Sequence, residues 1–239
     1  MTDLLCLTDS YLHFFEASVT SIATEHHGIT LDRTAFYPGG GGQPSDFGFI
    51  SFGDNHLPIK RAQKVGGKII HKLEDDFPLP EVGDLVTGMV NWEHRYKTMR
   101  THTAMHILCG VIFRNYGASV TGGNMEPLKG RMDFEFETMK RELVDEIDLA
   151  INEEVENARP VKIYSLSREE AFQIPDLIRT KINLLPEGIK KVRIVEIEGL
   201  DIQADGGTHV ANTSEVGKIR VVDYKSKGKI NKRIYVELD

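Results

Sequence analysis

Cysteines, long apolar runs and a targeting segment are scarce or missing in this sequence. Only two of its 239 residues are cysteine, Cys6 and Cys109, which is too few for a disulfide framework. No stretch approaches the roughly 20 consecutive apolar residues that a membrane-spanning helix needs. The first residues, Met-Thr-Asp-Leu-Leu-Cys, lack the basic start and apolar run of a signal peptide. We therefore expect a soluble protein of the cytoplasm, where thiols stay reduced.

The sequence also lacks an overall excess of positive charge. Its formal net charge is −7, which argues against a protein that coats nucleic acid without selectivity. The exception is the segment 216–239, where seven Lys or Arg residues stand against three acidic ones. Within it, residues 225–229 (Lys-Ser-Lys-Gly-Lys) are typical of a hairpin tip that could contact phosphates, although basic turns also occur as plain solvated surface.

The first part of the sequence reads as short β-strands. Alternating or wholly apolar runs are separated by turn residues such as Gly66 and Gly67. The expected strands are residues 12–21, 28–31, 48–52, 59–65, 68–72 and 84–90. Closure is the usual way for so many short strands to avoid bare edges, so we predict a small β-barrel domain over residues 1–90.

The second part mixes helices and strands. Helical spacing of apolar residues predicts a helix over residues 92–116, capped by Asn91, and another over residues 138–159 that Pro160 ends. The expected strands are residues 129–136, 161–164, 192–198, 218–223 and 230–238, and residues 167–170 have the spacing of a capping box. We predict an α+β domain over residues 91–239, with helices on a largely antiparallel sheet.

Two histidines on the first predicted helix indicate a metal site. His102 and His106 are four residues apart, so their imidazoles lie one above the other on one face. A distant Gly-rich turn, residues 205–209, supplies Asp205 and His209, also four apart. Three neutral nitrogens and one carboxylate oxygen suit zinc with a further position for water or substrate. A His-x-x-x-His pair alone is weak, and the second pair strengthens it.

A run of four glycines stands in the predicted barrel. Residues 36–44 read Phe-Tyr-Pro-Gly-Gly-Gly-Gly-Gln-Pro, followed by Asp46 and Gly48. Ordering consecutive glycines is entropically costly, so they suit a backbone that must approach another molecule closely. A flexible surface loop is the alternative. The flanking prolines and aromatic pair favour a loop with a definite shape.

Taken together, these segments resemble a known family. The glycine loop with Asp46 and Gly48, the run from Asn91 through His106, the run 206–217 containing Gly-Gly-Thr-His-Val, and the basic hairpin up to Ile234 are similar to freestanding alanyl-tRNA editing proteins of the AlaX type. These are similar in turn to the editing domain of alanyl-tRNA synthetase. The resemblance covers nearly the whole chain, including the N-terminal barrel, which a threonyl-type editing domain would not be expected to have.

The resemblance implies a zinc site with one departure. The family usually has cysteine where this chain has Asp205, so the expected ligands become His102, His106, Asp205 and His209. Carboxylate is a harder ligand than thiolate, which predicts a weaker or more open site. Cys109 is a poor substitute, because it lies about 10.5 Å along the helix from His102. We interpret it as a buried apolar thiol.

The resemblance also implies the reaction: hydrolysis of the ester that joins serine or glycine to the terminal adenosine of tRNA for alanine. Zinc would either activate a water or anchor the substrate, and the sequence leaves both open. No glutamate stands between His102 and His106, which argues against a His-Glu-x-x-His metalloprotease. Because the expected zinc takes part in the reaction, its ligands His102 and His106 are also candidate catalytic residues.

Selectivity needs a polar contact, because size alone distinguishes one methylene by only about 1–3 kcal/mol. Thr121, by its place after the metal helix in the resemblance, is the candidate for the serine hydroxyl; an ordinary strand threonine is the alternative. Gly41, Gly42 and Gln43 are expected to close over the substrate end.

We expect tRNA as the partner, with no DNA and no membrane, and Lys227, Lys229 and Arg233 as its contacts. Two other functions stay open: a zinc-stabilised tRNA-binding module without catalysis, and a hydrolase acting on threonyl-type or other small esters. The sequence does not indicate an oligomeric state.

Overall fold

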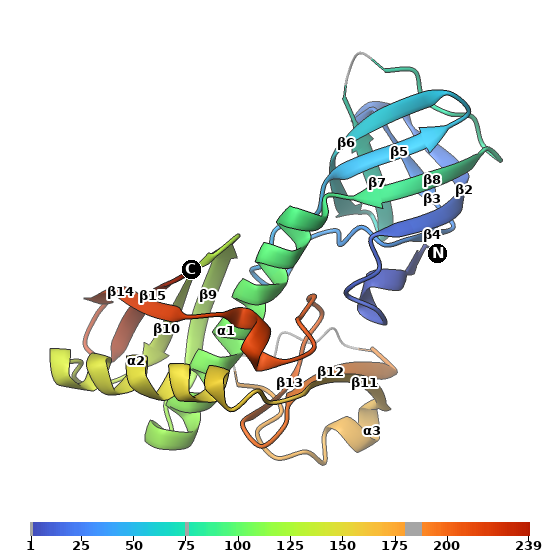
Figure 1. The fold of residues 1–239 in the computed structure, drawn as a ribbon. Helices are drawn as coiled ribbons and strands as arrows, with labels where there is room; N and C mark the ends of the chain where they lie inside the picture. Colours follow the sequence, from blue (N-terminus) through green and yellow to red (C-terminus); the bar gives the residue numbers. More distant parts are fainter. Residues whose placement is uncertain (1, 75–76, 180–187) are drawn as a thin grey trace. The chain divides into compact units, whose positions relative to one another are not determined.

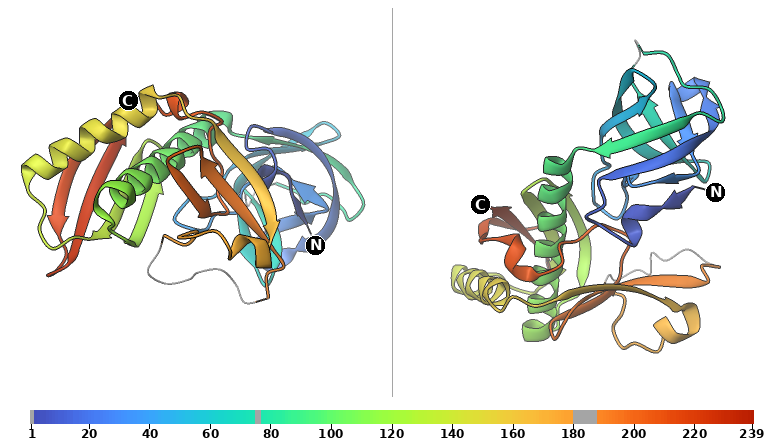
Figure 2. Two further views of the ribbon diagram at one scale, coloured as in Figure 1. Left: turned by 90° about the horizontal axis from the view of Figure 1, so that it is seen from below. Right: turned by 45° about the vertical axis from the view of Figure 1, so that its right-hand side comes forward.

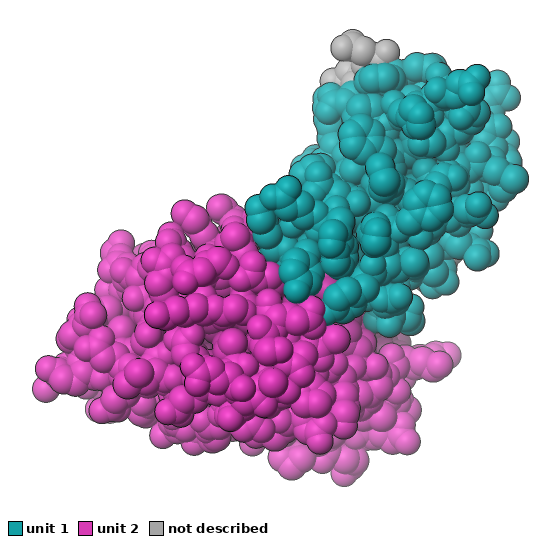
Figure 3. Space-filling view, viewed as in Figure 1, with its two compact units in different colours: residues 1–97 teal, residues 98–239 magenta. Residues whose placement is uncertain are grey.

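A computed structural model describes residues 2–74, 77–179 and 188–239. The chain divides into two compact units, residues 1–97 and residues 98–239 (Figure 3). The predicted fold class is confirmed: a closed barrel of strands is followed by antiparallel sheets with helices. No helix within the described ranges is both long and apolar enough to cross a membrane.

A six-stranded closed barrel dominates the first unit (Figure 1). Its order is β2-β3-β7-β6-β5-β8, and all its pairs are antiparallel. The barrel strands are β2 (Phe14–Ala23), β3 (Gly28–Leu31), β5 (Gly48–Phe52), β6 (Asn55–Val65), β7 (Lys68–Leu73) and β8 (Leu85–Val90). The short strands β1 (Asp3–Leu4) and β4 (Arg33–Thr34) pair in parallel as a separate two-stranded sheet, and the unit also has the 3-10 turns η1 (Leu5–Leu7) and η2 (Thr24–His26).

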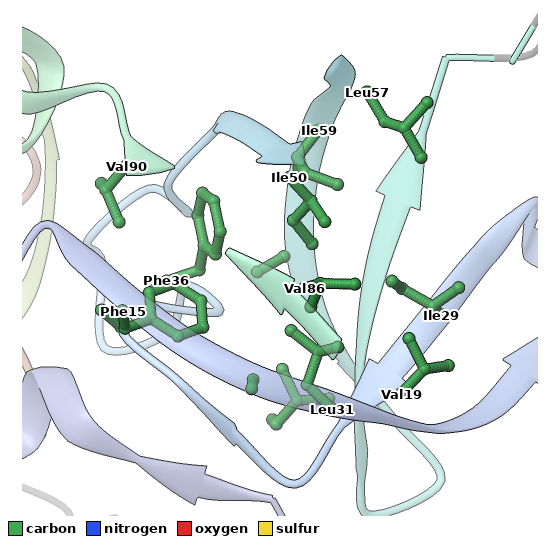
Figure 4. Close-up of a cluster of buried hydrophobic side chains, with 14 of the residues drawn as sticks. Phe15, Val19, Ile29, Leu31, Phe36, Ile50, Leu57, Ile59, Val86 and Val90 are labelled. Carbon is green, nitrogen blue, oxygen red and sulfur yellow. The ribbon is translucent and has the colours of Figure 1, made fainter. Parts of the chain in front are cut away.

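Alternation along the strands produces the barrel core. In β2, Phe15, Ala17 and Val19 are buried between more exposed neighbours. Figure 4 shows side chains meeting inside the barrel, among them Ile50 of β5, Val86 of β8 and Phe36 from the segment after β4. Successive side chains of a strand point to opposite faces, so every second residue of each strand lies in the barrel interior.

The second unit has two antiparallel sheets, whereas the sequence pattern predicted one. The four-stranded sheet has the order β14-β15-β10-β9, and the three-stranded sheet has the order β11-β12-β13. Their strands are β9 (Val120–Glu126), β10 (Lys129–Glu135), β11 (Val161–Ser167), β12 (Lys191–Ile197), β13 (Asp201–Ala204), β14 (Ile219–Ser226) and β15 (Asn231–Leu238). The helices are α1 (Trp92–Tyr116), α2 (Arg141–Glu156) and α3 (Arg168–Ala171), with the 3-10 turn η3 (Thr213–Val216). The predicted capping box of Ser167 and Glu170 opens α3.

Helix α1 lies between the two sheets of the second unit, as the left-hand view of Figure 2 shows. Asn91 accepts the hydrogen bond from the His94 N–H, as the sequence predicts for the cap. Every residue from 101 to 112 is buried, which fits a helix that is covered on all sides. Two glycines allow this close packing: a Cβ at Gly130 of β10 would meet the Met105 sulfur at 2.4 Å, and one at Gly110 would meet Leu200 at 2.9 Å.

Candidate metal centre

The two helix histidines lie as the spacing predicts. His102 and His106 are one turn apart on α1, with ring centroids 5.2 Å apart, and only 5% and 6% of their surfaces are exposed. The intervening Thr103 is buried. Its hydroxyl oxygen accepts a hydrogen bond from the Val210 N–H at 3.3 Å, so this turn of the helix is tied directly to the loop that follows β13.

That loop presents the second pair of side chains. Asp205 follows β13 directly, and its Oδ2 accepts a hydrogen bond from the Gly207 N–H at 2.6 Å. Arg193 of β12 donates to the Asp205 carbonyl oxygen at 2.9 Å. These two bonds fold the loop back on itself. His209, four residues on, thereby faces Asp205, with 3.2 Å between Nε2 and Oδ2.

The four side chains converge on one point. Their donor atoms all lie within 4.8 Å of one another, so His102, His106, Asp205 and His209 could hold a metal ion. Asp205 Oδ1 is 3.5 Å from His102 Nε2 and 4.0 Å from His106 Nε2. The His209 ring lies 4.2 Å from that of His102 and 4.7 Å from that of His106. Three imidazoles and a carboxylate in one buried cluster form a donor set that suits zinc.

Hydrogen bonds on the far side of two rings orient them for this role. His106 Nδ1 is 3.1 Å from Asp201 Oδ2, and His209 Nδ1 is 3.2 Å from the Thr103 hydroxyl. A carboxylate only accepts, so Nδ1 of His106 carries the proton and Nε2 keeps its lone pair. Nε2 is the nitrogen that faces Asp205 in each case. His106 is thus oriented to present its Nε2 lone pair toward the cluster.

Burial keeps most of these imidazoles neutral. It lowers the pKa of His102 to about 4, although Asp205 acts in the opposite direction. Burial and the neighbouring His102 hold the pKa of His209 well below its usual range. For His106, burial is outweighed by the hydrogen bond to Asp201, and its pKa is raised. Burial raises the pKa of Asp205, but the three imidazoles, led by His102, lower it by more. At neutral pH, His102 and His209 are therefore neutral and Asp205 is ionised, which are the forms that bind metal.

Asp201 is a site residue that the sequence patterns did not indicate. It is 4% exposed, and besides His106 it accepts from Gln203 Nε2 at 2.7 Å and lies 3.4 Å from Arg179 Nε. The Arg179 guanidinium in turn lies 3.8 Å from the centre of the Phe113 ring. The only signal in the sequence was a carboxylate between two apolar residues, Leu200 and Ile202, just before the predicted ligand loop.

We expect Asp201→Asn to weaken divalent metal binding by about 10–100-fold. The amide can turn its NH2 group toward His106 Nδ1, which moves the imidazole proton to Nε2 and blocks the lone pair. Metal titration of the purified protein measures the change. The matched control is Asp223→Asn, an exposed aspartate of β14 that pairs with Lys225. Unchanged metal affinity in Asp201→Asn would show that Asp201 has no part in orienting the ligand.

Cys109 is not a member of the four-residue cluster. Its side chain is buried, and burial raises the pKa of the thiol well above its usual range. A thiol in this state is a poor source of thiolate, which agrees with its interpretation as an apolar core residue.

The other predicted site residues lie outside this cluster. Thr121 has an exposed side chain in β9, at the bulge where the pairing with β10 shifts. Lys227 and Lys229 are exposed in the loop between β14 and β15, so the predicted basic hairpin is present. Arg233, on β15, holds Asp133 through two hydrogen bonds of 2.6 and 2.7 Å, so much of its charge is balanced within the sheet.

The glycine loop of the first unit has a definite shape. Gly40 and Gln43 exchange backbone hydrogen bonds of 3.1 and 2.9 Å, with Gly41 and Gly42 at positive φ between them. That conformation favours glycine over any other residue. At the base of the loop, the Asp46 carboxylate binds the fully buried Arg95.

The sequence of this chain is similar to those of known proteins over nearly its whole length. A family described as "Threonyl and Alanyl tRNA synthetase second additional domain" matches residues 192–235, and one described as "tRNA synthetases class II (A)" matches residues 10–94. A protein of Saccharolobus solfataricus named "Alanyl-tRNA editing protein AlaX-M" is 41% identical over 98% of both chains. The chain belongs to the AlaX family of alanyl-tRNA editing proteins.

Further relatives extend the AlaX match. A Methanosarcina barkeri protein named "Alanyl-tRNA editing protein AlaX-M" is 37% identical over 100% of this chain and 99% of its own length. An "Alanine--tRNA ligase" of Ignicoccus hospitalis is 37% identical over 90% of this chain but only 23% of its own length. The AlaX chain thus corresponds to about a quarter of that synthetase.

Proposed function

We propose that this protein is a trans-editing hydrolase that removes a wrong amino acid from tRNA for alanine. The substrate is the ester that joins serine, and also glycine, to the terminal adenosine. The observation that carries the proposal is the convergence of His102, His106, Asp205 and His209 in a chain whose full-length relatives are named alanyl-tRNA editing proteins.

We propose Zn2+ as the cofactor of this cluster. The support is its donor set of three imidazoles and one carboxylate, together with the hydrogen bonds of Asp201 and Thr103 that aim two Nε2 atoms inward. Zinc bound there would supply Lewis-acid chemistry, either polarising the ester carbonyl or lowering the pKa of a water. His102 and His106 contribute to catalysis as ligands of this ion. Burial lowers the pKa of His102 and of His209, which keeps these two imidazoles unprotonated at neutral pH.

Selection of serine over alanine is assigned to Thr121. A hydroxyl aimed at the serine hydroxyl rejects a substrate without one far better than a size filter does, because the unmatched polar group is left unpaired. The exposure of Thr121 in β9 leaves its side chain available for such a contact. Gly41, Gly42 and Gln43 are assigned to the substrate end, where a side-chain-free turn permits close backbone approach.

The body of the tRNA is assigned to the basic hairpin. Lys227 and Lys229 are exposed and suited to phosphate contacts. Arg233 follows them in sequence, on β15. This partner agrees with the naming of the relatives as alanyl-tRNA editing proteins.

The deciding experiment measures hydrolysis of seryl-, glycyl- and alanyl-tRNA for alanine, with and without a chelator. We expect fast cleavage of the seryl ester, cleavage of the glycyl ester, survival of the alanyl ester, and loss of all activity on chelation that added zinc restores. If a fully metallated protein binds tRNA but cleaves none of the three esters, the protein is a tRNA-binding module without catalysis. Cleavage of small esters without tRNA affinity would identify a different hydrolase.

A further inference from the structure

One strand pair of the barrel carries a concentration of positive charge. Residues 1–97 contain thirteen acidic and eight basic side chains, and five of those eight fall within residues 60–72, where there is no acid. The five are Lys60, Arg61, Lys64, Lys68 and Lys72. They lie on β6 and β7, the strands that the turn of Gly66 and Gly67 joins (Figure 1). We call this group the basic ribbon.

The pairing of the two strands brings like charges together. Arg61 lies directly opposite Lys72, and Lys68 lies opposite Val65 near the turn. The register shifts between Ile59 and Arg61, so a bulge places Lys60 beside Arg61. Like charges directly opposite each other destabilise a strand pair. Facing Arg61 against Lys72 therefore does not stabilise the strand pair.

Among the described residues, most of the ribbon's cations have no ion-pair partner. Lys60 pairs with Glu74 at 3.0 Å. Across the described ranges, Arg61, Lys64, Lys68 and Lys72 form no ion pair. The Lys60, Arg61, Lys64 and Lys68 side chains are exposed, and Lys72 is half-buried. Two exposed arginines elsewhere do have acidic neighbours: Arg33 pairs with Asp32, and Arg141 pairs with Asp145.

We propose that the basic ribbon is a second tRNA-binding surface, which contacts the phosphate backbone of a double-stranded part of the molecule. This rests on the proposed function for the identity of the partner. A row of exposed or half-buried cations, four of which have no ion pair in the described ranges, matches the row of phosphates along a nucleic-acid strand, and contacts of this kind bind without reading sequence. The ribbon thereby adds affinity for whole tRNA and leaves the chemistry at the ester unchanged.

The test compares wild type with Arg61→Gln/Lys68→Gln/Lys72→Gln. We expect the KM for seryl-tRNA to rise about tenfold or more at low salt. The slope of log affinity against log salt should fall by about two to three, because each phosphate that the variant no longer neutralises removes roughly 0.9 from it. The kcat, and the hydrolysis of a seryl-adenosine without tRNA body, should stay unchanged. The Tm should stay the same or rise, because the repulsion between Arg61 and Lys72 is removed.

The control is Arg33→Gln/Arg141→Gln, two exposed arginines that each pair with a nearby acid. We expect a KM and a salt slope close to wild type, which would show that removing two positive charges elsewhere on the surface does not have the effect of the ribbon variant. Equal KM and salt slope for the ribbon variant and wild type would overturn the inference and leave the editing proposal intact. If wild type binds tRNA but cleaves no ester, the editing proposal fails, and a reduced salt slope in the ribbon variant still supports the inference.

Discussion

Replacing His209 by alanine is expected to remove both the bound metal and the deacylase activity. His209 is 1% exposed and meets Asp205 at 3.2 Å, so its loss leaves three donors around an enlarged space. A metal that stabilises a transition state by several kcal/mol accounts for a fall of about a thousandfold or more in single-turnover seryl-tRNA hydrolysis. Elemental analysis of the purified variant should show less than one metal per chain.

His56→Ala is the matched control for this variant. His56 is exposed on β6 and contacts only the Ser51 hydroxyl in the described hydrogen-bond network, at 2.7 Å. We expect wild-type metal content and activity. Thermal denaturation separates a folding defect from a ligand defect, because added zinc should raise the Tm of wild type and of His56→Ala but not that of His209→Ala. Full metal content in His209→Ala would show that this imidazole is not a ligand.

Substitutions at Asp205 are expected to change zinc affinity in both directions. A structural zinc site binds with a free energy of about 10–16 kcal/mol, of which each of four ligands supplies about a quarter. We therefore expect Asp205→Ala to lower the zinc affinity on the order of a hundredfold. Asp205→Cys should bind zinc more tightly than wild type, by about tenfold, because thiolate is the softer ligand. Asp205→Asn keeps an oxygen that can accept the Gly207 N–H bond, and should fall between Ala and wild type.

Cys109→Ala tests whether the helix thiol contributes. Its side chain is buried outside the cluster, so we expect zinc affinity to stay close to wild type and only the Tm to fall, through a small cavity. Titration against a chelator of known affinity measures all four variants on one scale. A larger loss of metal in Cys109→Ala than in Asp205→Ala would mean that the ligand set is assigned wrongly.

Local patterns in the sequence predicted much of the fold. The limits of α1 at residues 92 and 116, of β3 at 28 and 31, and of β5 at 48 and 52 are those expected. In each case an apolar pattern is bounded by a turn residue or a cap, so one sequence signal determines both type and length. β6 begins earlier than predicted, at Asn55, because the turn at Gly53 and Asp54 is short and Pro58 is accommodated opposite Phe49.

The division of the second unit into two sheets could not be predicted in the same way. Whether β13 pairs with β12 or joins β15 depends on contacts between distant segments, such as the packing of Leu200 against Gly110. The alternation of apolar and polar residues in a strand shows which of its faces is buried, but it does not show which other strand it pairs with.

The candidate metal cluster was predicted because its four ligands belong to two short motifs. Asp201 belongs to neither motif, and its role depends on the approach of β13 to α1, which local spacing does not encode. The basic ribbon was likewise missed, because its cations come together only through the register of β6 and β7.

The ligands of the candidate metal centre come from two places about a hundred residues apart, α1 and the loop after β13. An unfolded chain cannot bring both pairs to one ion, so binding is linked to completed folding. All four ligands fall in residues 98–239, so the free energy of metal binding is added to the unfolding of that unit. During synthesis, therefore, the barrel can fold first, while the second unit cannot load its ion until the segment carrying His209 has left the ribosome.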